Sequence, residues 1–328
     1  MVSVSVIVPI YNAGRYLTDC LRSLQAQSLP SIEFILVLDC PSDGSDLIAR
    51  QFAANDPRFV VISNDKNLHI GNSRNRGIES AKGEYIAFCD HDDILTPDGY
   101  EQMYKAAKEH QAQYLITQPV IDRNGIIEQY RYSLPNNSQS INDTVLQDLL
   151  AFGGKTESES KYCFIHNILY SRSFLYQHHI RFVNTNLITN EDVVFNIETL
   201  LHHPYSSFLP QHLYTHRLIS TSSGHQDTYL AWDKRFNELE YIYSLLITNH
   251  FYTPPYNSYF WVTVQKKIID ELINLLRLKH DLPTFIKAYR QAKQYPFLRD
   301  AFRHYSDQRP RTPFKQLLRQ CCAYLLTL

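Results

Sequence analysis

Residues 85–93 read YIAFCDHDD, a short apolar run that ends in three carboxylates within four residues. The apolar part has the length and β-rich composition of a buried strand. Three similar runs precede it, at 4–8, 32–38 and 59–62. Stretches that are apolar on one helical face separate the runs, near 16–27, 45–55 and 71–81. This alternation predicts an α/β fold with a mainly parallel sheet flanked by helices.

The composition is that of a globular protein. The chain has 328 residues, with 44% hydrophobic and 20% charged residues, which argues against disorder. The six cysteines form no CxxC pair, so neither a disulfide framework nor a zinc knuckle is indicated. No apolar run approaches the roughly 18 residues of a membrane-spanning helix, and the first residues read as a strand rather than a signal peptide. We therefore expect a soluble, cytoplasmic protein.

Beyond about residue 225 the apolar residues recur at helical spacing, so we predict two parts, an α/β domain at 1–222 and a helical region at 223–328. Pro283, Pro296 and Pro313 each stand where a helix could begin. Residues 283–328 carry a net charge of +7 against −8 for the remainder. An apolar stripe along 314–328 beside basic residues fits peripheral contact with an anionic membrane, on the inner face of the cytoplasmic membrane. It equally fits a helix packed on the rest of the protein. Nothing resembles a nucleic-acid recognition motif.

The cluster Asp90, Asp92 and Asp93 needs a positive partner, because three carboxylates at one strand end repel one another. Mg²⁺ and Mn²⁺ take oxygen ligands, often one or two carboxylates together with substrate phosphates. The alternative is that Asp93 caps a helix near Pro97. That alternative explains one aspartate and not three.

Polar residues also follow the other predicted strands. Tyr11 follows the first strand, Asp39 ends the second, and Arg74 lies beyond the third. An aromatic face, a carboxylate and an arginine at neighbouring strand ends could hold a base, its imide N–H and a phosphate. Each has a plainer alternative: Tyr11 as a rim aromatic, Asp39 as a helix cap, and the nearby Gly71 and Gly77 as turn glycines.

The blocks VSVIVPIYNAGRYL, IEFILVLD, SDGS, SRNRGIESAKGEYIAF and CDHDD occur in an order and spacing that resembles the family-2 inverting glycosyltransferases with the GT-A fold. The resemblance implies a divalent metal cofactor, Mn²⁺ or Mg²⁺, held by Asp92 of the DXD motif together with Asp90. It implies that Tyr11 stacks on the base, Asp39 accepts from the uracil N3–H, Arg74 holds the nucleotide and Asp90 the ribose. It places Pro9, Asn12, Asn67 and His91 in the same nucleotide-sugar site. The sequence departs from the family at Leu38, where an aspartate is usual.

A second acidic pair, Glu191-Asp192, opens a predicted helix. Acids in the first turn of a helix are favourable in themselves, which is the plain alternative. The resemblance instead implies that Asp192 is the general base, with Glu191 beside it. It also suggests His216, in a segment after the last strand, as a further metal ligand, and places residues 164–172 on the acceptor side.

Together these features predict a metal-dependent, inverting hexosyl- or N-acetylhexosaminyltransferase. Its donor would be a UDP-sugar, and its acceptor a growing bacterial surface glycan, such as a capsule, lipopolysaccharide or exopolysaccharide, either free or linked to a lipid. Two alternatives remain. One is a catalytically silent protein of the same fold that binds glycans; the other is a sugar nucleotidylyltransferase, for which the sequence offers no glycine-rich basic loop after the first strand.

Overall fold

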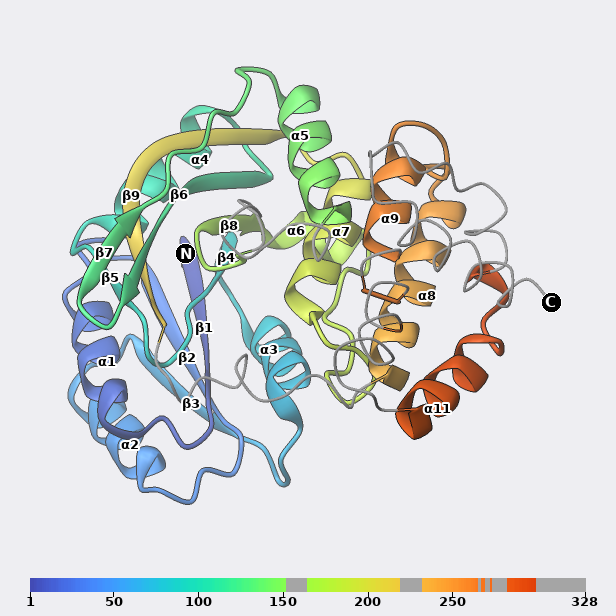
Figure 1. The fold of residues 1–328 in the computed structure, drawn as a ribbon. Helices are drawn as coiled ribbons and strands as arrows, with labels where there is room; N and C mark the ends of the chain where they lie inside the picture. The colour runs from blue at the N-terminus through green and yellow to red at the C-terminus, as the bar shows by residue number, and fades with distance from the viewer. Residues whose placement is uncertain (152–163, 219–231, 265–266, 269–271, 273–281, 299–328) are drawn as a thin grey trace. The chain divides into compact units, whose positions relative to one another are not determined.

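The structure, a computed structural model, describes residues 1–151, 164–218, 232–264, 267–268, 272 and 282–298. Strands and helices alternate along the first 88 residues (Figure 1). They are β1 (Val4–Ile10), η1 (Gly14–Tyr16), α1 (Leu17–Gln25), β2 (Ile32–Leu38), α2 (Ser45–Asn55), β3 (Phe59–Ser63), α3 (His69–Ser80) and β4 (Tyr85–Phe88). The four predicted strands and three predicted helices are confirmed, with ends that differ by two residues or fewer.

Strand β1 lies at the centre of the parallel part of the sheet, between β2 and β4 and parallel to both. All seven of its residues are buried, because helices cover both faces. Side chains alternate along a strand, so Val6 and Val8 join the core cluster that includes α1, while Ile7 faces α3. The predicted α/β architecture with flanking helices is confirmed.

Helix α3 packs closely on β1 at Gly77. A Cβ atom there would lie 2.3 Å from Cγ2 of Ile7, so only glycine fits. Gly71, in the first turn of the same helix, would place a Cβ 2.6 Å from the carbonyl oxygen of Val183. Both glycines therefore serve close packing inside a helix, and the alternative that they are turn glycines is wrong. This packing fixes Arg74, which lies between them on α3.

The later strands extend the same sheet in mixed directions. The remaining strands and helices are β5 (Ile94–Leu95), α4 (Gly99–Glu109), β6 (Tyr114–Arg123), β7 (Ile126–Gln129), α5 (Ser138–Leu150), β8 (Ile168–Ser171), α6 (Arg172–Gln177), α7 (Glu191–Leu201), β9 (Ser206–Leu218), α8 (Trp232–Thr248), α9 (Tyr256–Val264) and α11 (Leu282–Ala292). Among the described residues the strand order is β3-β2-β1-β4-β8-β6-β9-β5, with β7 paired to β6. Strand β8 runs antiparallel to β4 and β6, whereas β6 and β9 are parallel.

The chain divides into two compact units. Among the described residues, the first contains 1–145, 164–185 and 191–218, and the second contains 146–151, 186–190 and the residues from 232 onward. In the second unit, α8 buries one face through Trp232, Phe236 and Leu239, as the helical spacing predicts. The predicted boundary between 222 and 223 lies outside the described residues and stays a prediction.

Two of the three prolines expected at helix starts are described. Pro283 is the second residue of α11, and Pro296 begins a short helical turn, so both expectations are confirmed. Pro313 and the apolar stripe at 314–328 lie outside the described residues.

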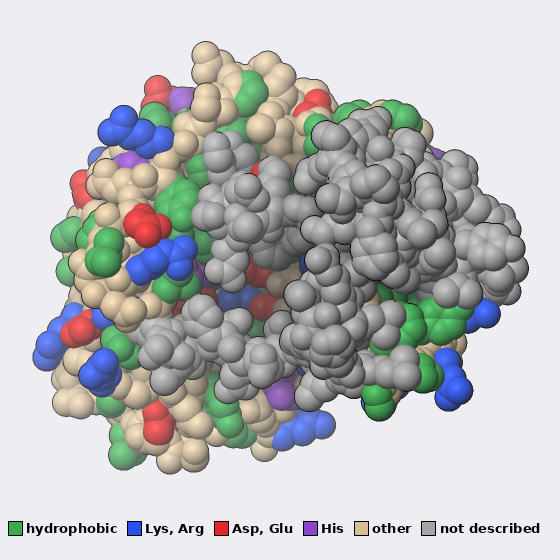
Figure 2. All heavy atoms as spheres, viewed as in Figure 1, with side chains coloured by type: hydrophobic (Ala, Val, Ile, Leu, Met, Phe, Trp, Pro, Cys, Tyr) green, Lys and Arg blue, Asp and Glu red, His purple; other side chains and the backbone are tan. Residues whose placement is uncertain are grey.

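No helix in the described part of the chain is long and apolar enough to cross a membrane. On the face drawn in Figure 2, acidic and basic side chains are interspersed, in keeping with a formal net charge of −1.

Candidate active site

The three aspartates after β4 lie at the carboxyl end of a parallel strand, where ligands of such sheets bind. They have three different environments. Asp93 is fully buried, and its carboxylate accepts hydrogen bonds from the Tyr214 hydroxyl at 2.5 Å, from Nδ1 of His216 at 3.0 Å and from the backbone N–H of Arg217 at 2.8 Å. Helix α4 begins at Gly99, after Asp98, so the alternative that Asp93 caps a helix is wrong. Asp93 instead anchors the acidic segment to β9.

Asp90 is held by two side chains. One oxygen accepts from the Arg74 guanidinium at 3.0 Å, and the other pairs with Nε2 of His166 at 2.8 Å. Burial alone would raise the pKa of Asp90, but His166 and Arg74 outweigh it and hold that pKa well below its usual range. Asp90 is therefore an anion fixed in place by the protein.

Asp92 stands apart from its two neighbours. No hydrogen bond or ion pair from any described residue reaches its carboxylate. Burial, followed by the charges of Asp93 and Asp90, raises its pKa to about 6. A carboxylate that is destabilised by its neighbours and left without a partner gains most from a bound cation.

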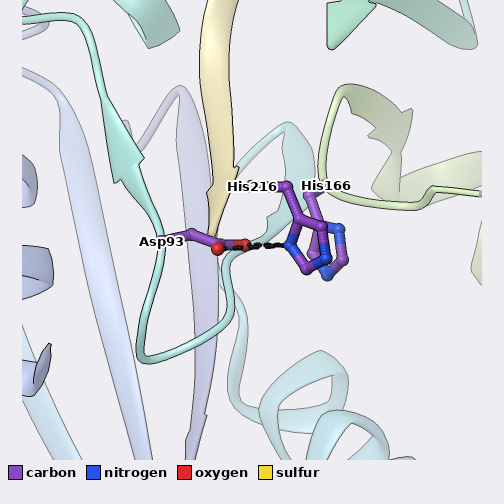
Figure 3. Close-up of side chains that lie close together, drawn as sticks. All are labelled: Asp93, His166 and His216. Atoms are coloured by element: carbon purple, nitrogen blue, oxygen red, sulfur yellow. Dashed lines mark hydrogen bonds and ion pairs between the residues drawn. The ribbon is translucent and has the colours of Figure 1, made fainter. Parts of the chain in front are cut away.

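Two histidines lie beside this acidic segment (Figure 3). His216 is in β9, where it points to the same side as Tyr214 two residues before it. The segment was expected after the last strand, and the structure corrects this: it is within β9. The rings of His166 and His216 stack with centroids 5.4 Å apart. One ligand atom from each of Asp93, His166 and His216 lies within 4.8 Å of the others.

The donor set fits a divalent cation. Asp93 accepts from Nδ1 of His216, which leaves Nε2 of that ring as the atom that can bind a metal. Burial would lower the pKa of His216, but Asp93 outweighs it and raises that pKa to about 9, so a metal would displace a proton here. Asp92 lies outside the group of three ligand atoms formed by Asp93, His166 and His216, so its part in holding a metal stays a prediction. The predicted ligands stay Asp92, Asp90 and His216. Asp93 is hydrogen-bonded to Nδ1 of His216, on the side of the ring opposite Nε2.

The second acidic pair opens α7. Glu191 accepts from the Arg74 guanidinium at 2.8 Å, so this one arginine pairs with a carboxylate from each acidic segment. Burial, and then the charge of Asp192, raises the pKa of Glu191 to about 7. Burial also raises the pKa of Asp192. Asp192 accepts only from the backbone N–H of Val193 among the described residues, at 2.8 Å, so its carboxylate is available for proton transfer.

Arg74 was expected to hold the nucleotide. In the structure its guanidinium is buried and pairs with Asp90 and Glu191, and it also lies over the ring of Phe182. These contacts give it a role in holding the two acidic segments together, and its contact with a nucleotide stays a prediction.

The other predicted nucleotide-sugar residues lie at or just beyond the carboxyl ends of β1, β2, β3 and β4. Nδ1 of His91 lies 3.2 Å from the carbonyl oxygen of Pro9, the last but one residue of β1. Tyr11 is 50% exposed, and its stacking on a base stays a prediction. Asp39 is buried and accepts at Oδ1 from the Leu68 N–H at 2.7 Å. The N-cap of α2 is Gly44, so the alternative that Asp39 caps the following helix is wrong.

Asn12 and Asn67 shape the neighbouring loops. Asn12 has a positive φ of 47°, and its side-chain oxygen accepts from the Ser42 N–H at 2.8 Å. The side-chain oxygen of Asn67 accepts from the His69 N–H at 2.9 Å. The structure therefore brings all the predicted residues of 1–92 to one edge of the sheet, and their roles toward a nucleotide stay predictions.

Sequence reasoning missed two features, the anchoring of Asp93 by Tyr214 and His216 and the pairing of His166 with Asp90. One signal was present: Tyr214 and His216 alternate in a β-rich segment and so share a strand face. No signal along the chain gives the pairing of that strand with β5, which brings it beside Asp93.

Comparison with known proteins identifies the family. Residues 5–177 match the model of glycosyl transferase family 2. EpsH of Bacillus subtilis is 46% identical over 105 residues, which are 32% of this chain and 30% of EpsH. The minor teichoic acid biosynthesis protein GgaB of the same organism is 35% identical over 108 residues, 32% of this chain and 12% of GgaB. The matched region is thus about a third of this chain and less than a third of either relative.

The fold also matches a solved structure. The crystal structure of S. aureus TarS 1–349 in complex with UDP-GlcNAc superposes with a TM-score of 0.74, over 99% of this chain and 89% of that one, at 19% identity. At that identity the likeness concerns the fold alone. The family model, by contrast, matches more than half of the sequence, and the chain therefore belongs to glycosyl transferase family 2.

Proposed function

We propose that this chain is an inverting glycosyltransferase that moves a sugar from a UDP-sugar to a hydroxyl of a bacterial surface glycan. The observation that carries the proposal is the bridge by Arg74, whose guanidinium pairs with Asp90 at 3.0 Å and with Glu191 at 2.8 Å. It holds a donor-side acidic segment next to a carboxylate suited to act as a base. Membership of family 2, and the names of TarS bound to UDP-GlcNAc and of GgaB, support the donor and the acceptor class.

Asp192 is the general base in this proposal. A hydroxyl is a poor nucleophile, so a carboxylate must take its proton as its oxygen attacks the anomeric carbon. Burial raises the pKa of Asp192, which makes it a stronger base than an exposed aspartate. The attack forms the new glycosidic bond as the bond to the UDP oxygen breaks, and UDP leaves with that electron pair. One displacement inverts the configuration, so an α-linked donor gives a β-linked product.

Asp92, with Asp90 and His216, would hold Mn²⁺ or Mg²⁺ on the donor side. When bound, the ion would stabilise the charge that develops on the leaving diphosphate. Asp93 fixes the ring of His216 through Nδ1, and Arg74 and His166 keep Asp90 ionised. Tyr11 would stack on the base and Asp39 would accept from its imide.

Residues 310–328, which lie outside the described residues, would hold the enzyme reversibly at an anionic membrane where a lipid-linked acceptor is found. Each basic side chain near such a surface contributes about 1 kcal/mol, and salt screens it. Deleting residues 310–328 should abolish sedimentation with anionic liposomes and spare transfer to a short soluble acceptor. Unchanged sedimentation together with a lower melting temperature would instead make the tail part of the packed protein.

The main experiment is a thermal-shift screen of UDP-GlcNAc, UDP-glucose and UDP-galactose with and without Mn²⁺, followed by an assay for released UDP. A ligand that binds only the native state raises its stability. We expect one donor to raise the melting temperature more with Mn²⁺, and to release UDP when a glycan acceptor is added. Binding without UDP release from any acceptor would favour the catalytically silent alternative.

A further inference from the structure

Glu238 is a buried charge in the middle of α8. Its side chain is 1% exposed, in a helix that otherwise buries apolar residues. Burying a carboxylate costs several kcal/mol unless it is paired and hydrogen-bonded, so its presence calls for a reason. Lys267 supplies the pairing cation, with Nζ 2.6 Å from Oε1. Burial would raise the pKa of Glu238, but Lys267 outweighs it and lowers that pKa, so the group is ionised at neutral pH.

Among the described residues, the other contacts of this carboxylate go to two consecutive residues, Thr189 and Asn190. It accepts from the Thr189 hydroxyl and from the Thr189 backbone N–H at 3.3 Å. It also accepts from the Asn190 backbone N–H at 3.1 Å and from the Asn190 amide at 3.0 Å. Two backbone groups and two side chains of one short segment therefore converge on a single carboxylate.

The same helix holds this segment at a second point. Asn237, next to Glu238, donates from its side chain to the carbonyl oxygen of Leu187 at 3.1 Å. Residues 187–190 are thus tied to α8 along their length. The next two residues of the chain are Glu191 and Asp192, the acidic pair that opens α7.

We propose that Glu238 is a positioning residue for Asp192. By binding the N–H groups of Thr189 and Asn190, its carboxylate fixes the backbone immediately before α7 and so fixes where the Asp192 side chain stands. A charge is suited to this task, since hydrogen bonds from backbone N–H groups to an ionised acceptor are shorter and stronger than those to a neutral one. The inference rests on the proposed function, in which Asp192 takes the proton of the acceptor.

A salt bridge with Lys267 alone would not account for this arrangement. An ion pair inside a protein is often no more stabilising than apolar residues of the same volume. Glu238 differs because its carboxylate accepts hydrogen bonds from the backbone N–H groups of Thr189 and Asn190. Its loss would remove the acceptor that holds the backbone immediately before α7. Misplacing a catalytic group by about 1 Å costs on the order of 10²-fold in rate.

The test compares Glu238→Ala with Leu246→Ala, a buried apolar residue two turns further along α8 that touches neither segment 187–190 nor the acidic pair in any contact described above. Both variants should lower the melting temperature. Only Glu238→Ala should lower kcat, by about 10²-fold, while the KM for the UDP-sugar stays as in the wild type. Glu238→Gln, which keeps one oxygen acceptor, should fall between the wild type and the alanine variant.

A double-mutant cycle separates positioning from stability. In an Asp192→Asn background, adding Glu238→Ala should cause little further loss of kcat, because residues that act through the same group are not additive. Equal kcat values for the Glu238→Ala and Leu246→Ala variants, or a full additive loss in the cycle, would overturn the inference. If Glu238→Ala does not fold, Glu238→Gln and Asn190→Ala carry the same comparison. A wild-type enzyme that releases no UDP would instead overturn the proposed function, and the two failures are distinct.

Discussion

Two acidic segments form the candidate site, one after β4 and one at the start of α7. In each, one carboxylate without a side-chain partner among the described residues lies beside at least one carboxylate that other residues hold. After β4, Asp90 is paired with Arg74 and His166 while no described residue hydrogen-bonds Asp92. At the start of α7, Glu191 is paired with Arg74 while Asp192 accepts only from the next backbone N–H among the described residues. The pattern is the same although one segment follows a strand and the other begins a helix.

The difference lies in what surrounds the free carboxylate. Asp92 is next to Asp93 and near Asp90, so neighbouring negative charge adds to burial in raising its pKa to about 6. Asp192 is near the Arg74 charge, which opposes the effect of burial on its pKa. The excess negative charge around Asp92 favours the binding of a cation. The carboxylate of Asp192, whose pKa burial raises, is suited to accept a proton. From this comparison we expect Asp92 and Asp192 to have separate tasks, which single substitutions can distinguish.

The largest expected effect is on the rate of transfer. Replacing Asp192 with Asn should lower kcat by on the order of 10²-fold or more, because the general base is lost. Binding of UDP, measured by isothermal titration, should stay as in the wild type. The control is Glu198→Gln, two turns further along α7, which should keep the wild-type rate. Normal turnover of the Asp192 variant would move the base to Glu191.

The next effect is on stability. Replacing Arg74 with Lys removes the planar guanidinium group, which pairs with Asp90 and Glu191 at once. A lysine ammonium cannot reproduce both pairs, so one buried carboxylate loses its partner. The free energy of unfolding in urea should fall by about 3 kcal/mol. Arg76→Lys, on the same helix and in no ion pair with any described residue, is the matched control. Equal unfolding midpoints for the two variants would show that Arg74 does not join the two segments.

A smaller effect concerns pH. The folded pKa of His216 is about 9, above the ordinary value of 6.5, so the pair with Asp93 stabilises the folded protein fully below pH 6.5. That contribution is lost as the pH rises through about 9. In metal-free protein, the difference in the free energy of unfolding between the wild type and His216→Gln should therefore shrink between those two pH values. A difference that stays constant would show that the ring is not charged beside Asp93.

The parallel half of the sheet could be predicted from the sequence because each of its strands and helices is marked by a short run of neighbouring residues. β2 and β4 have the predicted ends, and Asp90 and Asp92 follow β4 where the strand pattern puts them. The surroundings of these aspartates depend on long-range pairing instead. His166 precedes β8 and Tyr214 lies in β9, and the register of those strands is set by pairing partners far away in the chain.

The same reasoning explains why the partners of Asp93 could not be predicted. Its position four residues before Pro97 left a helix cap as an alternative, and only the pairing of β5 with β9 shows that three donors of another strand converge on it. Glu238 could not be predicted either, because helical spacing marks position 238 only as part of α8. Its task depends on residues 189–190, which lie 48 and 49 positions earlier.

The separation of the two free carboxylates is tested most directly by titrating UDP-sugar into Asp92→Asn and Asp192→Asn side by side, each with and without Mn²⁺. The account predicts that Asp192→Asn keeps the gain in donor affinity that Mn²⁺ gives the wild type, and that Asp92→Asn loses it. A gain in Asp92→Asn equal to that of the wild type would contradict the account, because the cation would then be held without the carboxylate that we assign to it.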